Sequence, residues 1–301
     1  MRNGLNEGIK VARASSRGLM TPPLYLMIPF VLSGVLISLR NGGAPNIVET
    51  LLFSVSVIII TAATNLFDDF FDVRNGIDVP GAPNTKYRKH PVFDMSLKPE
   101  KLLEYGILLI TALAIILIVI SVSIHNLLIL LILPLGALIS YGYTGDPFRL
   151  KYRGLGEAAV SISFIALSLI EIYSTSGTLG SGSVLLILQG SLAFPTVIFS
   201  GNIRDYTWDR DSGIRTVATV AGTAGSMLIL RLMWVISTAF GVIFIISLGR
   251  PLLLFLLIPL LLTMFIAIYL TAIKDLTRIE TVIGTCAFAS VMISLIGLVL
   301  I

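Results

Sequence analysis

The sequence predicts an all-α membrane protein that crosses the bilayer several times. Three observations lead to this prediction: 55% of the 301 residues are hydrophobic, only 13% are charged, and the mean hydropathy is +0.95. Soluble domains carry roughly twice that share of charged residues. Because the backbone must satisfy its own hydrogen bonds in lipid, the long apolar runs are expected to be helices. The alternating pattern of a membrane barrel is absent from the sequence.

Nine apolar runs have about the 20 residues that a helix needs to cross the bilayer. They fall near residues 22–39, 47–67, 102–122, 126–144, 156–175, 182–201, 225–247, 251–273 and 280–301. Arg250 and Pro251 separate the seventh run from the eighth, because proline ends or kinks a helix. The first 20 residues are basic and mildly amphipathic, so we expect them to lie on the membrane surface. We interpret residues 1–301 as one transmembrane domain.

Lysine and arginine residues predict the orientation in the membrane. With the N-terminus in the cytoplasm, the cytoplasmic segments hold 18 of the 21 basic residues, and the opposite side holds only Arg40 and Arg250. We therefore expect a multi-pass protein of the cell membrane, with long polar loops after spans two, four and six in the cytoplasm. Glu171 is the only acidic residue well inside a span, and the sequence suggests no partner for it.

Two polar triplets with the same spacing lie four spans apart. Their members are Asn65, Asp68 and Asp72 at the end of the second span, and Asn202, Asp205 and Asp209 at the end of the sixth. Residues at positions i, i+3 and i+7 share one face of a helix. The repetition predicts a duplicated four-helix unit, spans 1–4 and 5–8, with the ninth span added.

If the two polar faces meet, four carboxylates come together near the bilayer, where like charges and burial both oppose ionisation. Divalent cations offset this negative charge, and a set of oxygen ligands favours Mg²⁺ or Ca²⁺. Mg²⁺ is typically held by a few carboxylates together with substrate phosphates. Basic residues flank both triplets: Lys86, Arg88, Lys89, Arg149, Lys151, Arg153, Arg204 and Arg215. Basic side chains beside a carboxylate–metal cluster suit a diphosphate.

A diphosphate that is handled at a membrane by an apolar protein suggests an isoprenoid substrate. The chemistry would be ionisation of an allylic diphosphate, with Mg²⁺ and basic residues stabilising the departing group. A cation-coupled transporter is the alternative from another class, but its charges would be expected near the bilayer midplane rather than at helix ends. No nucleic-acid partner is expected, because topology and an anionic small substrate account for the positive charge.

Three segments resemble the signatures of the UbiA superfamily of intramembrane prenyltransferases. They read DDFFDVRNGID, YTGDPFRLKYRGLGE and NIRDYTWDRDSGIRTVATVAG, and the third is the most specific. The resemblance covers roughly residues 20–300 and is closest to the menaquinone branch, the 1,4-dihydroxy-2-naphthoate prenyltransferases. It implies nine helices around a central cavity, with the two aspartate motifs facing each other under a cytoplasmic cap. It also implies Mg²⁺-dependent transfer of an isoprenyl group from a prenyl diphosphate to a lipophilic aromatic acceptor, a quinone precursor.

The resemblance implies the following roles for the polar residues. The metal ligands, which are also the catalytic residues, would be Asp72, Asp205, Asp209 and either Asp68 or Asp69. The duplicated spacing favours Asp68 and the family motif favours Asp69, and a helix places the two about 100° apart. The diphosphate would contact Lys151, Arg153, Arg88 and Arg204, with Asn65 and Asn202 as amide ligands.

Several properties stay open at this point. The prenyl chain length and the oligomeric state do not follow from the sequence, and neither does the acceptor. Geranylgeranylglyceryl phosphate, 4-hydroxybenzoate, haem or a chlorophyll precursor are alternative acceptors for the same chemistry.

Overall fold

The computed structural model describes residues 22–83, 85, 89–123, 125–249 and 279–299, together with four single positions between 255 and 265. This part of the chain is helical, with one isolated β-bridge. Its elements are α2 (Pro22–Arg40), α3 (Ile47–Arg74), α5 (Pro99–Ser123), η1 (Leu127–Leu131), α6 (Ile132–Ser140), η2 (Leu150–Tyr152), α7 (Gly156–Ser176), α8 (Ser181–Ala193), α9 (Pro195–Arg204), α10 (Tyr206–Asp211), α11 (Val217–Ser247) and α13 (Ile279–Val299). The predicted surface segment 1–20 and nearly all of the predicted span 251–273 lie outside the described residues.

Six helices in the described part are long and apolar enough to cross a membrane. They are Ile47–Arg74, Pro99–Val119, Gly156–Ser176, Ser181–Arg204, Val217–Ser247 and Thr281–Val299. The predicted spans 22–39 and 126–144 correspond to shorter apolar helices, Val31–Arg40 and Leu127–Ser140. A helical, multi-pass membrane protein is therefore confirmed, whereas the count of nine spans stays a prediction.

The predicted span 126–144 differs most from the structure. It opens with the 3₁₀ turn η1, whose first turn is capped because the Asn126 side chain accepts from Leu128 N at 3.1 Å. Its α-helix, α6, ends at Ser140 rather than at residue 144. The shorter helix leaves the chain after Ser140 to form the loop that carries η2, and this loop reaches the candidate site.

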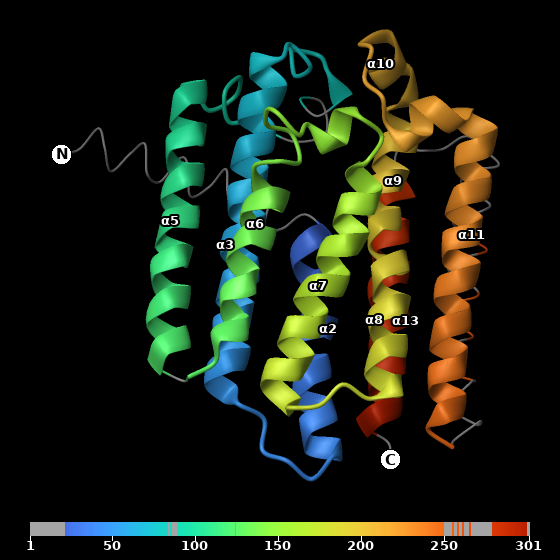
Figure 1. Ribbon diagram of the computed structural model, residues 1–301. Coiled ribbons are helices and arrows are strands. Elements are labelled where there is room, and N and C mark those ends of the chain that lie inside the picture. The colour runs from blue at the N-terminus through green and yellow to red at the C-terminus, as the bar shows by residue number, and fades with distance from the viewer. Residues whose placement is uncertain are drawn as a thin grey trace.

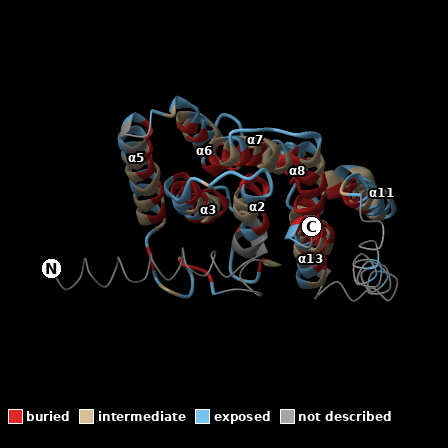
Figure 2. Ribbon diagram, turned by 90° about the horizontal axis from the view of Figure 1, so that it is seen from below, coloured by how far each residue is buried: buried red, intermediate tan, exposed pale blue. Residues whose placement is uncertain are grey.

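The helices pack side by side along a common direction (Figure 1). Helix α3 contacts α5, α2 contacts α7, α8 contacts α11, and α13 contacts both α2 and α9. Seen along the bundle, the buried residues lie on the faces that the helices turn toward one another (Figure 2). Many exposed side chains are apolar as well, as expected for faces that touch lipid.

The end of α3 is held by an aromatic cluster. Phe67, Phe70 and Phe71 are buried and pack against Leu97 and Leu102 on the side of α5. Phe67 and Phe71 also contact the Tyr141 ring edge-on, at centroid distances of 5.6 and 5.3 Å. Because these side chains fill one side of the helix, the polar residues between them face elsewhere.

The polar segments lie together at one end of the bundle. The last turns of α3, the loop that carries η2, and α10 all lie at the upper end in Figure 1. We call this the aspartate end. The first residues of α3 and the last residues of α7 lie at the opposite end of the bundle.

Candidate active site at the aspartate end

The first aspartate motif lies within a single helix. Asn65, Asp68 and Asp72 occupy the last three turns of α3, which runs unbroken to Arg74. Asp72 is fully buried, whereas the Asp68 side chain is 21% exposed. The prediction that the triplet shares one helix face is confirmed for Asp68 and Asp72, because both contact the same lysine.

That lysine is Lys151, in the 3₁₀ turn η2. Its Nζ lies 2.8 Å from Asp68 Oδ1 and 2.7 Å from Asp72 Oδ2, and both contacts are hydrogen-bonded ion pairs. Burial acts to lower the pKa of Lys151, but the charges of Asp68 and Asp72 outweigh it and raise that pKa well above its ordinary value. Lys151 therefore stays charged and balances the two carboxylates.

A backbone turn places Lys151 at this position. Arg149 adopts a left-handed conformation with φ of 47°, which reverses the chain just before η2. The Lys151 backbone N–H then donates to Tyr143 O at 2.8 Å and ties η2 to the chain that leaves α6. The guanidinium of Arg149 lies over the Tyr152 ring, 5.1 Å from its centroid.

Tyr152, next to Lys151, also reaches the motif. Its hydroxyl donates a short hydrogen bond to Asp72 Oδ1. Burial raises the pKa of Tyr152; the nearby Lys151 charge opposes this, and the Asp72 and Asp68 charges add to it. The phenol is thus a proton donor, and both Asp72 carboxylate oxygens are held, one by Lys151 and one by Tyr152.

The second motif spans a break between two helices. Asn202 lies in α9, Asp205 lies between α9 and α10, and Asp209 lies in α10. Helical hydrogen bonds continue across the break, from Asp205 N to Gly201 O at 2.9 Å and from Asp209 N to Asp205 O at 3.0 Å. The single helix predicted for this triplet therefore has to be corrected, because Asp205 joins two short helices instead of lying within one.

Neighbouring side chains hold the second motif. Arg204 forms a two-pronged ion pair with Asp205, at 2.8 and 2.7 Å. Asn202 Nδ2 donates to Glu157 Oε1 at 2.8 Å. Asn202 and Arg204 therefore each contact a carboxylate, and the contact with diphosphate that the sequence suggests for them stays a prediction.

The charge of Lys151 links the two motifs. Burial raises the pKa of Asp209 to about 7, and Asp205 and Glu157 add to this shift. Lys151 is the largest influence in the opposite direction and lowers the pKa of Asp209, while it also contacts Asp68 and Asp72. The charge of Lys151 thus acts on carboxyl groups of both motifs at the aspartate end.

The two motifs end in the same backbone turn. Ile77 N donates to Asp72 O and Ile214 N donates to Asp209 O, both at 2.8 Å. Between them, Gly76 and Gly213 have φ of 71° and 73°, and each donates to the residue three positions before it at 3.1 Å. This is the Schellman arrangement that ends many helices. Asp72 and Asp209 hold the same position in it.

A backbone contact joins the two loops that carry these groups. Arg153 and Arg215 form an isolated parallel β-bridge, so the segment after η2 runs beside the segment after α10. Gly154, with φ of 72°, lies against this contact, since a Cβ there would come within 3.5 Å of Arg215 O. The Arg153 side chain itself is exposed.

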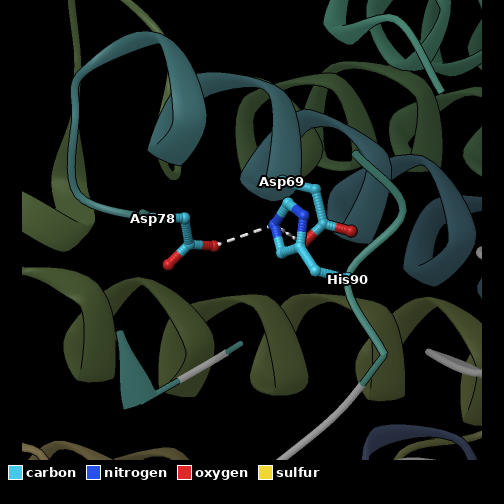
Figure 3. A group of neighbouring side chains, drawn as sticks. All are labelled: Asp69, Asp78 and His90. Atoms are coloured by element: carbon cyan, nitrogen blue, oxygen red, sulfur yellow. Dashed lines mark hydrogen bonds and ion pairs between the residues drawn. The ribbon is translucent and has the colours of Figure 1, made fainter. Parts of the chain in front are cut away.

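Asp68 and Asp69 point to different partners. Asp69 is buried and its Oδ1 lies 3.9 Å from His90 Nε2, while Asp78 Oδ2 lies 3.2 Å from the same nitrogen (Figure 3). His90 Nδ1 accepts from Val92 N at 3.2 Å, which leaves the proton on Nε2 to be donated to Asp78. Asp69 thus belongs to a separate cluster on the His90 side of the helix, and Asp68 lies with Asp72.

The cluster of Asp69, Asp78 and His90 was not expected from the sequence. Its ligand atoms lie within 4.8 Å of one another, a spacing that can hold a metal ion. His90 Nδ1 is already used by the backbone, and His90 also stacks on Phe93 at 4.7 Å. We interpret the cluster as a set of structural contacts that hold the loop after α3 against that helix.

The donor set at the aspartate end fits a hard divalent cation and a phosphate. The described carboxylates offer only oxygen ligands, and burial of Asp209 disfavours its charge unless a cation is added. Asn65 Nδ2 is buried and has no hydrogen-bond partner within the described part of the chain. A buried amide donor without a partner is costly, and a phosphate oxygen would satisfy it.

The structure brings some of the predicted residues together. Lys151 contacts Asp68 and Asp72, and its charge also lowers the pKa of Asp209. Asp205 is paired with Arg204. Arg88 lies outside the described residues. Glu157, His90 and Tyr152 were not predicted from the sequence as site residues.

Comparison with known proteins places the chain in a family. Residues 26–292 match the model of the UbiA prenyltransferase family. UbiA prenyltransferase domain-containing protein 1 of Xenopus tropicalis is 26% identical over 75% of this chain and 66% of its own length. A 1,4-dihydroxy-2-naphthoate octaprenyltransferase of Bacillus subtilis (strain 168) is 28% identical over 61% of this chain and 59% of its own length. The chain thus spans about three fifths to two thirds of these relatives.

The fold also matches a solved structure. A UbiA homologue from Archaeoglobus fulgidus, bound to DMAPP and Mg²⁺, aligns with a TM-score of 0.66 at 13% identity, over 97% of this chain and 100% of that one. At this identity the likeness establishes the fold alone. Because the family model covers most of the sequence, the chain belongs to the UbiA prenyltransferase family.

Proposed function

We propose that this protein transfers an isoprenyl group from an allylic prenyl diphosphate to a lipophilic acceptor within the membrane and releases diphosphate. One observation carries the proposal: Lys151 pairs with Asp68 and Asp72, and the loop that carries it is joined by a β-bridge to the segment that follows the second motif, at one end of an apolar bundle. Such a cluster is suited to a metal-bound diphosphate, with the isoprenoid tail extending into the apolar helices.

We propose that Asp68, Asp72, Asp205 and Asp209 hold Mg²⁺. Bound there, Mg²⁺ would act as a Lewis acid on the diphosphate oxygens and stabilise the charge of the leaving group. The Archaeoglobus fulgidus homologue of the same fold, bound to DMAPP and Mg²⁺, supports a Mg²⁺ requirement. Asp69 was a candidate ligand as well, but its contact with His90 supports a structural role.

Lys151 and Asn65 are the proposed contacts to the diphosphate itself. Lys151 is charged and lies between the carboxylates, and Asn65 Nδ2 offers a buried donor. Arg153 and Arg88 are proposed to add positive charge from the loops, whereas Asn202 and Arg204 orient Glu157 and Asp205. Tyr152 holds Asp72 in place.

The acceptor is proposed to be aromatic, a quinone precursor. The Bacillus subtilis relative supports this choice, and it also supports a place in menaquinone biosynthesis. Geranylgeranylglyceryl phosphate is an equally compatible acceptor, since the aspartate end would bind the donor in the same way. We further propose nine spans, two repeats of four, and a cell membrane location with the aspartate end in the cytoplasm.

An assay of prenyl transfer tests the proposal. Purified protein in lipid is given geranyl or geranylgeranyl diphosphate, with Mg²⁺ or with a chelator, and a panel of acceptors that includes 1,4-dihydroxy-2-naphthoate and geranylgeranylglyceryl phosphate. The expected result is a prenylated product that requires Mg²⁺ and is lost in Asp72→Ala. If no acceptor is prenylated and the wild type binds prenyl diphosphates no better than Asp72→Ala, the proposal is wrong.

A further inference from the structure

A small pocket that contains two buried glutamates lies at the end of the bundle opposite the aspartate end. It is lined by Glu49 near the start of α3, by Glu171, Ser174 and Thr175 near the end of α7, and otherwise by apolar side chains. Glu49 and Asp72 are 23 positions apart on the same helix, so about 35 Å of helix separate this pocket from the aspartate end. The proposed prenyl transfer does not use this pocket.

Glu171 enters the pocket from α7. Its side chain is almost fully buried, and Thr175 Oγ1 donates to Oε1 at 3.5 Å. The same Oε1 lies directly against α2, because a Cβ on Gly34 would come within 2.4 Å of it. The other oxygen, Oε2, is buried and has no hydrogen-bond partner within the described part of the chain.

Glu49 enters the pocket from α3 and is only 6% exposed. Asn126 Nδ2 donates to Glu49 Oε1 and to Ser174 Oγ, both at 3.3 Å, and so links α3 to α7. Glu49 Oε2 is likewise buried without a hydrogen-bond partner among the described residues. Two carboxylates from different helices thus each leave one oxygen unsatisfied in the same pocket.

No basic side chain balances the two carboxyl groups of this pocket, because none of the described residues that line it is Lys, Arg or His. Removing a carboxylate from water without a partner costs several kcal/mol for each group, so a pair of them needs a compensating charge. Two carboxylates carry a charge that matches one divalent cation.

The size and donors of the pocket indicate which ligand fits. The cavity has a volume of about 10 Å³, which is about the space of one water molecule or one ion and too small for the organic molecules that occupy pockets of roughly 300–1,000 Å³. Carboxylates and hydroxyls are oxygen donors, which suit hard cations. Ca²⁺ accepts irregular oxygen geometry, whereas Mg²⁺ demands near-octahedral geometry and retains several waters.

We propose that Glu49 and Glu171, with the hydroxyls of Ser174 and Thr175, bind a divalent cation of the Ca²⁺ type. Such an ion would join α3 to α7 at the end of the bundle away from the aspartate motifs. It would have a structural role, and prenyl transfer would not depend on it directly.

The test compares binding of radiolabelled Ca²⁺ by the purified protein with that of three variants. Glu171→Gln and Glu49→Gln remove one ligand each, and Asp72→Asn reports on any Ca²⁺ held at the aspartate end. Glu104→Gln is the matched control, because that side chain is 59% exposed. We expect one Ca²⁺ site whose affinity falls at least about tenfold in Glu171→Gln and in Glu49→Gln. The affinity of this site should be unchanged in Asp72→Asn and in the control.

The unfolding temperature gives a second measurement, which also shows whether each variant is folded. Ca²⁺ is expected to raise the unfolding temperature of the wild type and of Asp72→Asn, but not that of Glu171→Gln or Glu49→Gln. The proposal is overturned if Ca²⁺ binding is equal in the wild type and in both glutamate variants. It is also overturned if the wild-type protein does not bind Ca²⁺, which would mean that the two carboxylates share a proton or hold only water.

Discussion

Lys151 Nζ lies 2.7 Å from Asp72 Oδ2, so a residue of the loop after α6 neutralises the buried carboxylate at the end of α3. The same ammonium contacts Asp68 at 2.8 Å, and its charge lowers the pKa of Asp209. Lys151 is thus positioned to balance the carboxylates and to contact a diphosphate held by them.

Replacing Lys151 tests both roles. Lys151→Gln removes a charge-assisted contact worth about 1.5–3 kcal/mol, so the KM for prenyl diphosphate should rise about tenfold or more. The variant should also unfold at a lower temperature than the wild type in the presence of a chelator, because Asp72 is left buried and unpaired. Mg²⁺ should then restore part of the lost stability. Lys101→Gln, at an exposed ion pair, is the control; equal KM values in Lys151→Gln and the control would contradict the assignment.

Asp68 and Asp69 should differ in what their loss affects. Asp68→Asn removes a proposed metal ligand and should lower kcat/KM about a hundredfold, with a higher Mg²⁺ requirement. Asp69→Asn weakens the contact with His90 and should mainly lower the unfolding temperature, with little change in Mg²⁺ dependence. Activity at several Mg²⁺ concentrations and thermal unfolding distinguish the two. If Asp69→Asn changes the Mg²⁺ requirement more than Asp68→Asn does, the roles are reversed.

Tyr152 is predicted to position Asp72. Tyr152→Phe keeps the ring and removes the hydroxyl that donates to Asp72 Oδ1. One lost hydrogen bond to a charged group corresponds to about 1.5–3 kcal/mol, so kcat/KM should fall about 10- to 100-fold. The change should appear chiefly as weaker Mg²⁺ activation. Tyr173→Phe, in an exposed position at the far end of α7, is the control; equal Mg²⁺ activation in the two variants would remove Tyr152 from the site.

The two helix-ending glycines should have similar importance. Gly76→Ala and Gly213→Ala each place a side chain at φ near +70°, while a new Cβ would touch nothing within 4 Å. The cost is therefore conformational, about 1–2 kcal/mol in each case. Gly180→Ala is the control, because the added Cβ is equally free of contacts and φ is −85°. Unfolding in denaturant measures all three, and a large difference between Gly76 and Gly213 would argue against equivalent motifs.

The sequence predicted the parts of the fold and site that depend on local pattern. Apolar runs identified the long helices, and the repeated spacing identified Asp72 and Asp209, which the structure places at the same position in two matching turns. These features depend on helix periodicity and on glycine at a fixed offset, both of which are readable in one chain.

Other contacts depend on tertiary packing and could not be predicted. Asp68 and Asp69 differ because His90, brought back by the loop after α3, contacts only one side of the helix. The break between α9 and α10 at Asp205, where Arg204 pairs with the Asp205 carboxylate, leaves no trace in the i, i+3, i+7 spacing. The sequence suggests no partner for Glu171, because the pocket that Glu171 shares with Glu49 forms only where α3 and α7 pack together.

The central claim is that the two aspartate motifs form one site, and a double-mutant cycle on Asp72 and Asp209 tests it most directly. Mg²⁺-dependent prenyl transfer is measured for Asp72→Asn, Asp209→Asn and the double variant. Asp211→Asn is the control, because its side chain is 63% exposed. If the two residues act as a unit, each single change should cost about a hundredfold or more and the double variant little more than either alone. If the two losses multiply, or if either single variant keeps the activity of the Asp211→Asn control, the motifs do not form one site and the account is wrong.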